Sequence, residues 1–110
     1  MTLPRTYVDV TVDTTGAITC SPDPVPVRQA DSVLAFRLRT PGFAFRDDNA
    51  IVVSNPGADF PQPSRTVRPT RATLLDLDRE NGAYTYSVFV VEQQSGRVIK
   101  GDPTIDNQPE

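Results

Sequence analysis

The stretch that decides the fold is Ala83-Tyr84-Thr85-Tyr86-Ser87-Val88-Phe89-Val90-Val91, followed by Arg97-Val98-Ile99-Lys100. Apolar residues recur at every second position in the first run, and this period of two sends successive side chains to opposite faces of a sheet. Gln94-Ser95-Gly96 separates the two runs, and Gly96 suits the positive φ that closes a short hairpin loop. The stretch therefore predicts a β-hairpin.

The same alternation recurs through the rest of the chain. Turn-forming residues separate the segments, since 11 Pro and 6 Gly are present in 110 residues. We therefore predict an all-β fold, an immunoglobulin-like or cupredoxin-like two-sheet sandwich of seven or eight mostly antiparallel strands. The core is expected to contain the apolar residues that are in phase with their strands: Val8, Val10, Leu34, Phe36, Leu38, Tyr86, Val88 and Val90.

Length and charge limit the domain organisation and the partners. A chain of 110 residues has the size of one domain, so we expect a single domain over residues 1–110, with residues 102–110 as an acidic tail or last edge strand. The net charge of -3 comes from the acids of this tail, and it argues against nucleic-acid binding. Because no apolar window reaches about 18 residues and no signal peptide is evident, we expect no membrane span and a cytoplasmic protein.

Metal and thiol chemistry have few candidate residues. The chain has no His and a single Cys20. A blue-copper site needs two His and a Cys, so this class is excluded, and Cys20 is expected to be a buried or half-buried structural thiol. We expect no cofactor and no resident metal.

A calcium site remains an alternative to that expectation. Asp76-x-Asp78-x-Glu80 resembles the start of a calcium-binding loop, but Asn81 and Ser87 occupy the positions where that loop needs Gly and Glu. A looser site between loops, joined by the Asp47-Asp48 pair, is still open.

Two further features have competing interpretations. Residues 58–69 show no regular period and contain several prolines, which predicts a long surface loop. Arg65, Arg68 and Arg71, flanked by Pro and Thr, are interpreted as a solvated cluster rather than a phosphate site. Tyr84 has the spacing of a tyrosine corner, which would bond back to the loop backbone, but it could equally be an ordinary buried aromatic residue.

The Asp102-Pro103 bond is the feature with the most unusual chemistry. Proline makes the peptide a tertiary amide, and the Asp102 carboxyl is close enough to attack or protonate its own carbonyl group. If the chain stays extended, Lys100, Asp102, Thr104 and Asp106 share one face, so Lys100 and Asp106 could assist cleavage. The plainer alternative is a strand that ends in an Asp-Pro turn.

The C-terminal Gly-Asp-Pro-Thr-Ile-Asp-Asn-Gln-Pro, after a Tyr-rich strand and a short return strand, resembles the bacterial DP-EP family. The Pro-Gly-Phe-Ala-Phe segment at 41–45 also fits that family. The resemblance implies a small β-sandwich and an aspartic-peptidase-like self-cleavage in which Asp102 and Pro103 flank the scissile bond. This chain has Gln108-Pro109 where a Glu-Pro dipeptide is expected, so the resemblance assigns no second catalytic carboxylate.

A second function of a different class is a structural or interaction module. Phe89 and Val91 are apolar on the face opposite Tyr86 and Val88, so this strand is apolar on both sides. Such a strand is either covered within the fold or provides a contact between copies of the chain. We therefore expect a homo-oligomer if no other part of the chain covers Phe89.

Overall fold

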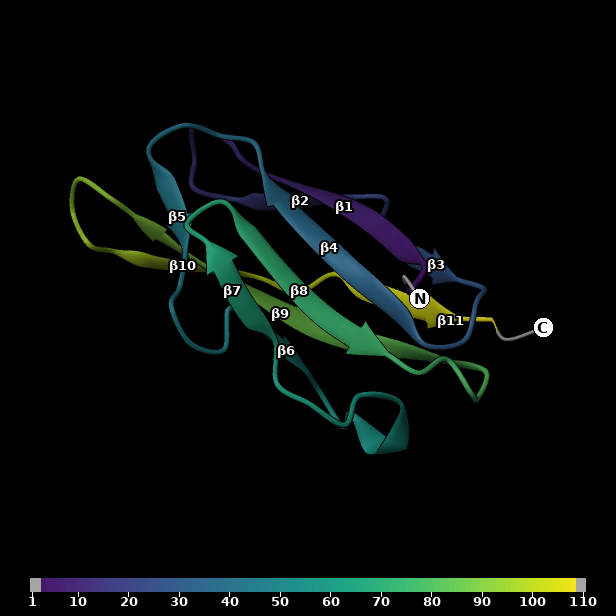
Figure 1. Cartoon of the computed structure of the whole chain (residues 1–110). Helices are drawn as coiled ribbons and strands as arrows, with labels where there is room; N and C mark the ends of the chain where they lie inside the picture. Colours follow the sequence, from purple (N-terminus) through teal and green to yellow (C-terminus); the bar gives the residue numbers. More distant parts are fainter. Residues whose placement is uncertain (1–2, 109–110) are drawn as a thin grey trace.

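The computed structural model describes residues 3–108 as two β-sheets packed face to face (Figure 1). The first sheet has five strands. Their order is β2 (Ile18–Ser21), β1 (Arg5–Val12), β4 (Ser32–Leu38), β8 (Arg71–Asp76) and β7 (Arg65–Arg68).

The second sheet is organised around β9 (Gly82–Glu92), the strand of the quoted stretch. One side of β9 pairs first with β11 (Thr104–Asn107) and then with β10 (Val98–Gly101), so the predicted hairpin is confirmed. The other side pairs with β5 (Phe43–Phe45) and β6 (Ile51–Val53). On that side β11 pairs in turn with β3 (Val25–Val27), which forms the edge of the sheet, and proline-rich segments are confined to such edges.

Seven of the nine strand pairs are antiparallel, as predicted. The parallel pairs are β1 with β4 and β11 with β3. Between β1 and β4 the chain leaves the first sheet after β2, contributes β3 to the second sheet, and returns as β4 beside β1.

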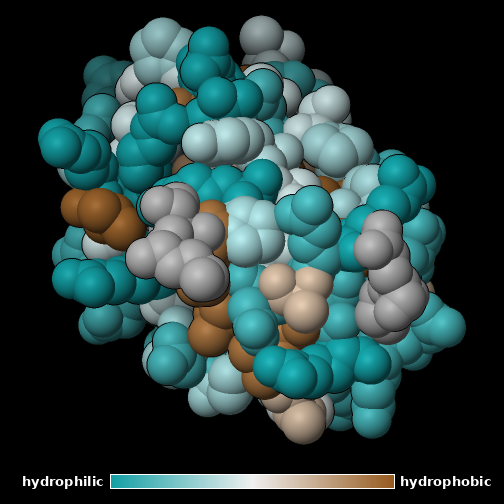
Figure 2. Space-filling model, turned by 45° about the vertical axis from the view of Figure 1, so that its right-hand side comes forward, coloured by the Kyte–Doolittle hydropathy of each residue, from teal (hydrophilic) through white to brown (hydrophobic). Residues whose placement is uncertain are grey.

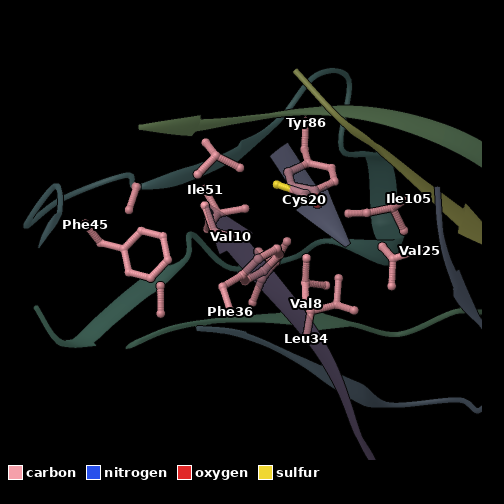
Figure 3. Packing of buried hydrophobic residues seen from close by; sticks show 14 of the residues in the cluster. Val8, Val10, Cys20, Val25, Leu34, Phe36, Phe45, Ile51, Tyr86 and Ile105 are labelled. Atoms are coloured by element: carbon pink, nitrogen blue, oxygen red, sulfur yellow. The ribbon is translucent and has the colours of Figure 1, made fainter. Parts of the chain in front are cut away.

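The core lies between the two sheets, and all eight predicted core residues are at most 6% exposed. Figure 3 shows Tyr86 of one sheet pointing toward Phe36 and Val10 of the other. The rings of Phe36 and Tyr86 are tilted at 59° with their centroids 5.6 Å apart, which is a favourable aromatic geometry. Cys20 is buried beside them, as expected for a structural thiol.

The structure corrects three details of the sequence prediction. The described residues form eleven strands rather than seven or eight, because several edge strands are only three or four residues long. Residues 58–69 are not a plain loop, since they include the end of a short 3-10 helix, η1 (Gly57–Asp59), and the strand β7. The segment after Pro103 is not an edge strand, because β11 lies between β9 and β3. Pro109 and Glu110, the end of the predicted tail, lie outside the described residues.

The face shown in Figure 2 is mostly hydrophilic, and hydrophobic side chains appear on it in small areas between polar ones. Within residues 3–108, no helix has the length and apolar character needed to cross a membrane.

Candidate functional site

The Asp102-Pro103 bond lies at the break between β10 and β11, opposite the middle of β9. β10 pairs with residues 88–91 of β9, and β11 pairs with residues 82–85. The chain therefore follows β9 on both sides of the bond. The alternation predicted for an extended chain is confirmed, because Lys100, Asp102, Thr104 and Asp106 face outward while Pro103 and Ile105 are buried.

Two side chains hold the Asp102 carboxylate on the outer face. The Ser87 hydroxyl donates a hydrogen bond of 2.8 Å to Asp102 Oδ1, and Lys100 Nζ lies 3.6 Å from the same oxygen. The Asp102 side chain remains 54% exposed, so water reaches it. The structure thus brings Lys100 and Asp102 together as predicted and adds Ser87, which the sequence interpretation did not assign to this site.

The prolyl side of the bond is also anchored. The Tyr86 amide donates to the Pro103 carbonyl at 2.9 Å, and the Thr104 amide donates to Asp23 Oδ1 at 2.9 Å. Asp23 belongs to the proline-rich segment before β3 and is a second carboxylate beside this stretch of backbone. It lies 81 positions from Thr104 in the sequence, so no local pattern could have indicated it.

Asp106 does not join this group of contacts. It pairs with Ala83 in the sheet, and its Oδ2 accepts a hydrogen bond of 2.6 Å from Gln108 Nε2. No hydrogen bond or ion pair within residues 3–108 links Asp106 to Asp102. No contact therefore supports the expected assistance of cleavage by Asp106. For Lys100 the 3.6 Å distance between its Nζ and Asp102 Oδ1 does support it.

The outer face of the first sheet is basic, which the sequence interpretation missed. Strand alternation and register place six arginines there: Arg5, Arg37, Arg39, Arg65, Arg68 and Arg71. Asp9 is the only acidic side chain that the described strands β1, β4, β7 and β8 present on this face, and it pairs with Arg37 at 2.9 Å. We call this surface the basic face.

A groove of about 290 Å³ runs across the basic face. Its floor is low because the small residues Ala35 and Thr73 are paired neighbours on β4 and β8. Tyr7, which is 48% exposed, and Val67, which is 55% exposed, also line the groove. The arginines that line it are Arg5, Arg68 and Arg71.

The charge of the basic face is only partly neutralised within the chain. Arg37 uses its guanidinium both in the ion pair with Asp9 and in stacking 4.7 Å from the centroid of the Tyr7 ring. Within residues 3–108, Arg5, Arg65, Arg68 and Arg71 make no ion pair. Arg65, Arg68 and Arg71 are exposed, as predicted for a solvated cluster, but the expected loop is wrong because they lie on the paired strands β7 and β8.

The apolar residues on the outside of β9 are partly covered by the chain itself. The Arg46 guanidinium lies 3.9 Å from the centroid of the Phe89 ring, a cation-π contact, and Phe89 is half-buried. This cover weakens the original reason to expect self-association through Phe89, and the homo-oligomer stays a prediction.

The remaining alternatives are decided by position. The Tyr84 ring packs edge-on against Phe60, with centroids 4.9 Å apart, and its hydroxyl makes no hydrogen bond within residues 3–108, so it is an ordinary packed aromatic residue.

Asp47 and Asp48 are exposed and line a separate groove beside β5. The alternative of a calcium site that joins Asp47 and Asp48 to Asp76 and Asp78 has no support, because the first two side chains are exposed and the last two are buried.

A scan of the sequence against protein-family models and a search of curated proteins both found no match. The resemblance to the DP-EP family therefore rests on the quoted residues alone and stays a prediction.

Proposed function

We propose that this protein is an interaction module that binds an acidic protein segment through the basic face. The observation that carries the proposal is the concentration of six arginines on one side of a chain whose net charge is -3. Arginine is well suited to this task because its planar guanidinium can hold a carboxylate through two parallel hydrogen bonds.

The groove favours an extended acidic segment over a compact anion. Arg37, Arg71 and Arg68 occupy paired positions on three adjacent strands, so their backbones are about 5 Å apart from strand to strand. Tyr7 and Val67 provide apolar surface in the same groove, and a peptide can cover this surface with its own side chains. The negative charge of the whole chain disfavours a nucleic acid that would extend beyond this face.

Fluorescence anisotropy with a labelled glutamate-rich peptide tests the proposal. We expect binding that weakens as salt increases and that is reduced at least tenfold by the double substitution Arg68→Gln and Arg71→Gln. Arg28→Gln, which changes an exposed arginine outside the basic face, is the matched control and should bind normally. Binding that the double substitution leaves intact, or tighter binding of single-stranded DNA, would refute the assignment.

Self-cleavage at Asp102-Pro103 is a second candidate, and the contacts around the bond favour it specifically. Ser87 and Lys100 orient the Asp102 carboxylate, while Tyr86 and Asp23 hold the backbone beyond Pro103. A carboxylate oxygen would bond to the Asp102 carbonyl carbon and form a cyclic anhydride. The bond to the proline nitrogen would break, this nitrogen would take a proton from Lys100 or water, and water would then open the anhydride.

Mass spectrometry of purified protein tests self-cleavage directly. We expect two pieces, residues 1–102 and 103–110, which remain associated because Ile105 is fully buried and β11 pairs on both sides. Asp102→Asn should abolish the conversion, and Pro103→Ala should slow it. If the protein keeps its full mass after long incubation from mild acid to neutral pH, the chain is not self-processing.

A further inference from the structure

A buried acidic cluster lies at one end of the sandwich, away from the basic face. It consists of Asp59 at the end of η1, Asp76 at the end of β8, Asp78 in the following turn, and Asn107 at the end of β11. These side chains are between 0 and 3% exposed. Ionisable side chains are rarely this buried unless a partner compensates their charge, so the cluster needs an explanation.

Part of the polar surface in this cluster is satisfied by hydrogen bonds. Asn107 Nδ2 lies between two carboxylates and donates to Asp59 Oδ2 at 3.0 Å and to Asp76 Oδ1 at 2.9 Å. The backbone amides of Arg79 and Glu80 donate to the Asp59 carboxylate, and the Asp78 amide donates to Asp76 Oδ1. All these donors are neutral, and within residues 3–108 no ion pair reaches any of the three acids.

Four buried oxygens in the cluster have no hydrogen-bond partner within residues 3–108. They are Asp76 Oδ2, both carboxylate oxygens of Asp78, and Asn107 Oδ1. Unpaired acceptors of this kind are costly to bury, and a buried carboxylate without a countercharge is costlier still.

We propose that Asp59, Asp76, Asp78 and Asn107 bind a divalent cation, and that this cation is calcium. The atoms with which these four side chains can bind a metal ion are all oxygens, which excludes the soft ligand sets of zinc and copper sites. Calcium accepts six to eight oxygen ligands in flexible geometry, whereas magnesium needs a near-ideal octahedron and retains several waters. Three carboxylates and one amide from three segments of the chain fit the more flexible ion better.

Binding requires one local rearrangement. Within the described residues, no group of three or more His, Cys, Asp or Glu side chains is arranged to hold a metal ion, and the Asn107 amide nitrogen now separates Asp59 from Asp76. Rotation of the Asn107 amide would exchange its nitrogen for its unpartnered oxygen. The two ends of an amide have nearly the same size, so this rotation leaves the packing unchanged. The adjoining residues Arg79 and Glu80 are exposed, so an ion has a short path from solvent.

Thermal unfolding and calorimetry of the full chain test the site after treatment with EDTA. Added calcium should raise Tm by several degrees at saturation and release or absorb heat with a stoichiometry of about one, because an ion that binds only the folded state stabilises it. Magnesium should produce a smaller rise. The Asn107 side-chain amide signals in an NMR spectrum should shift as the nitrogen leaves the two carboxylates.

Two substitutions and a control separate binding from folding. Asp78→Asn removes a buried charge with almost no change in shape, so it should fold and lose the calcium response. Asn107→Asp adds a carboxylate and should strengthen calcium binding about tenfold, as a larger ligand charge does in calcium loops, while lowering Tm in EDTA. Asp47→Asn changes an exposed acid outside the cluster and should respond like the unmodified chain.

The proposal is overturned if Tm and heat stay flat up to about 10 mM calcium, a concentration above the weak end of known calcium sites. It is also overturned if Asp78→Asn responds to calcium as the unmodified chain does, or if magnesium matches calcium.

Discussion

Replacement of Tyr86 by Phe is expected to stabilise this protein, although it removes a polar group from the centre of the core. Tyr86 is fully buried, and its hydroxyl has no hydrogen-bond partner within residues 3–108. Burial raises the pKa of this phenol far above its ordinary value, so the hydroxyl stays neutral. The Cys20 thiol lies beside the ring (Figure 3), but the two groups do not meet hydrogen-bond geometry.

The expected gain follows from the cost of an unsatisfied hydroxyl. Burying such a group without a partner costs about 1–3 kcal/mol. Its removal leaves a small void, and the cost of this void offsets only part of the gain. We therefore expect Tyr86→Phe to raise the free energy of unfolding by about 1 kcal/mol. In a domain of this size the gain corresponds to an increase in Tm of about 4–8 °C.

Urea unfolding at 25 °C measures this difference. The slope of the free energy of unfolding against urea concentration should stay the same, which shows that only the stability has changed. Tyr84→Phe is the matched control, because Tyr84 is half-buried and packs against Phe60, and it should change stability by less than about 0.5 kcal/mol. A loss of about 1 kcal/mol in Tyr86→Phe would refute the reasoning and assign a hydrogen bond to the Cys20 thiol. A double-mutant cycle with Cys20→Ala would then show coupling between the two side chains.

Three further predictions concern other parts of the fold. Gly101→Ala should cost about 1–3 kcal/mol in urea unfolding, because a Cβ there would lie 2.9 Å from Ile18 Cβ, and a neutral result would show that β2 can move aside. Ile105→Ala should lower the free energy of unfolding by about 2–5 kcal/mol, because Ile105 is fully buried. Val98→Ala, at a site 49% exposed, should lower it by less than about 0.5 kcal/mol, and equal losses in the two variants would contradict the packing of β11. Burial raises the pKa of Cys20 from its ordinary value of 9.0 to about 11, because the folded protein favours the neutral thiol. The stability that this preference contributes should be present below pH 9 and lost as pH rises toward 11. At pH 8 the folded protein should also react with iodoacetamide about 100-fold more slowly than the urea-unfolded chain, and equal rates would contradict the burial of the thiol.

The strands could be predicted because their signal is local. Val8, Val10, Leu34 and Phe36 are apolar at alternate positions, and each is fully buried in the structure. Alternation requires only that one face of a strand meets a core, so it is visible without knowledge of the neighbouring strand. β7 was missed because its four residues include two exposed arginines and are preceded by prolines, and only its pairing with β8 makes it a strand.

The sites depend on contacts between distant segments, which no local pattern specifies. Asn107 lies 48 positions from Asp59 and 31 from Asp76, so the sequence could suggest Asp76 and Asp78 but not the residues that complete their cluster. One signal was present. Asn107 is in phase with Pro103 and Ile105, which predicts a polar side chain that points into the core.

The pairing of β3 with β11 sets a condition on how the protein matures during synthesis. These strands pair Ile105 with Val25 and Asn107 with Val27, so the paired residues are 80 positions apart in the sequence. At about 5–20 residues per second, a ribosome needs about 4–16 seconds to supply the partner of β3 after β3 itself has been made. During that time the apolar side chains of Val25 and Val27 have no strand beside them. A nascent chain that stalls before Thr104 would therefore expose an unpaired, apolar strand edge to the chaperones of the cell. We expect chaperone binding to be strongest for chains that end just before that residue.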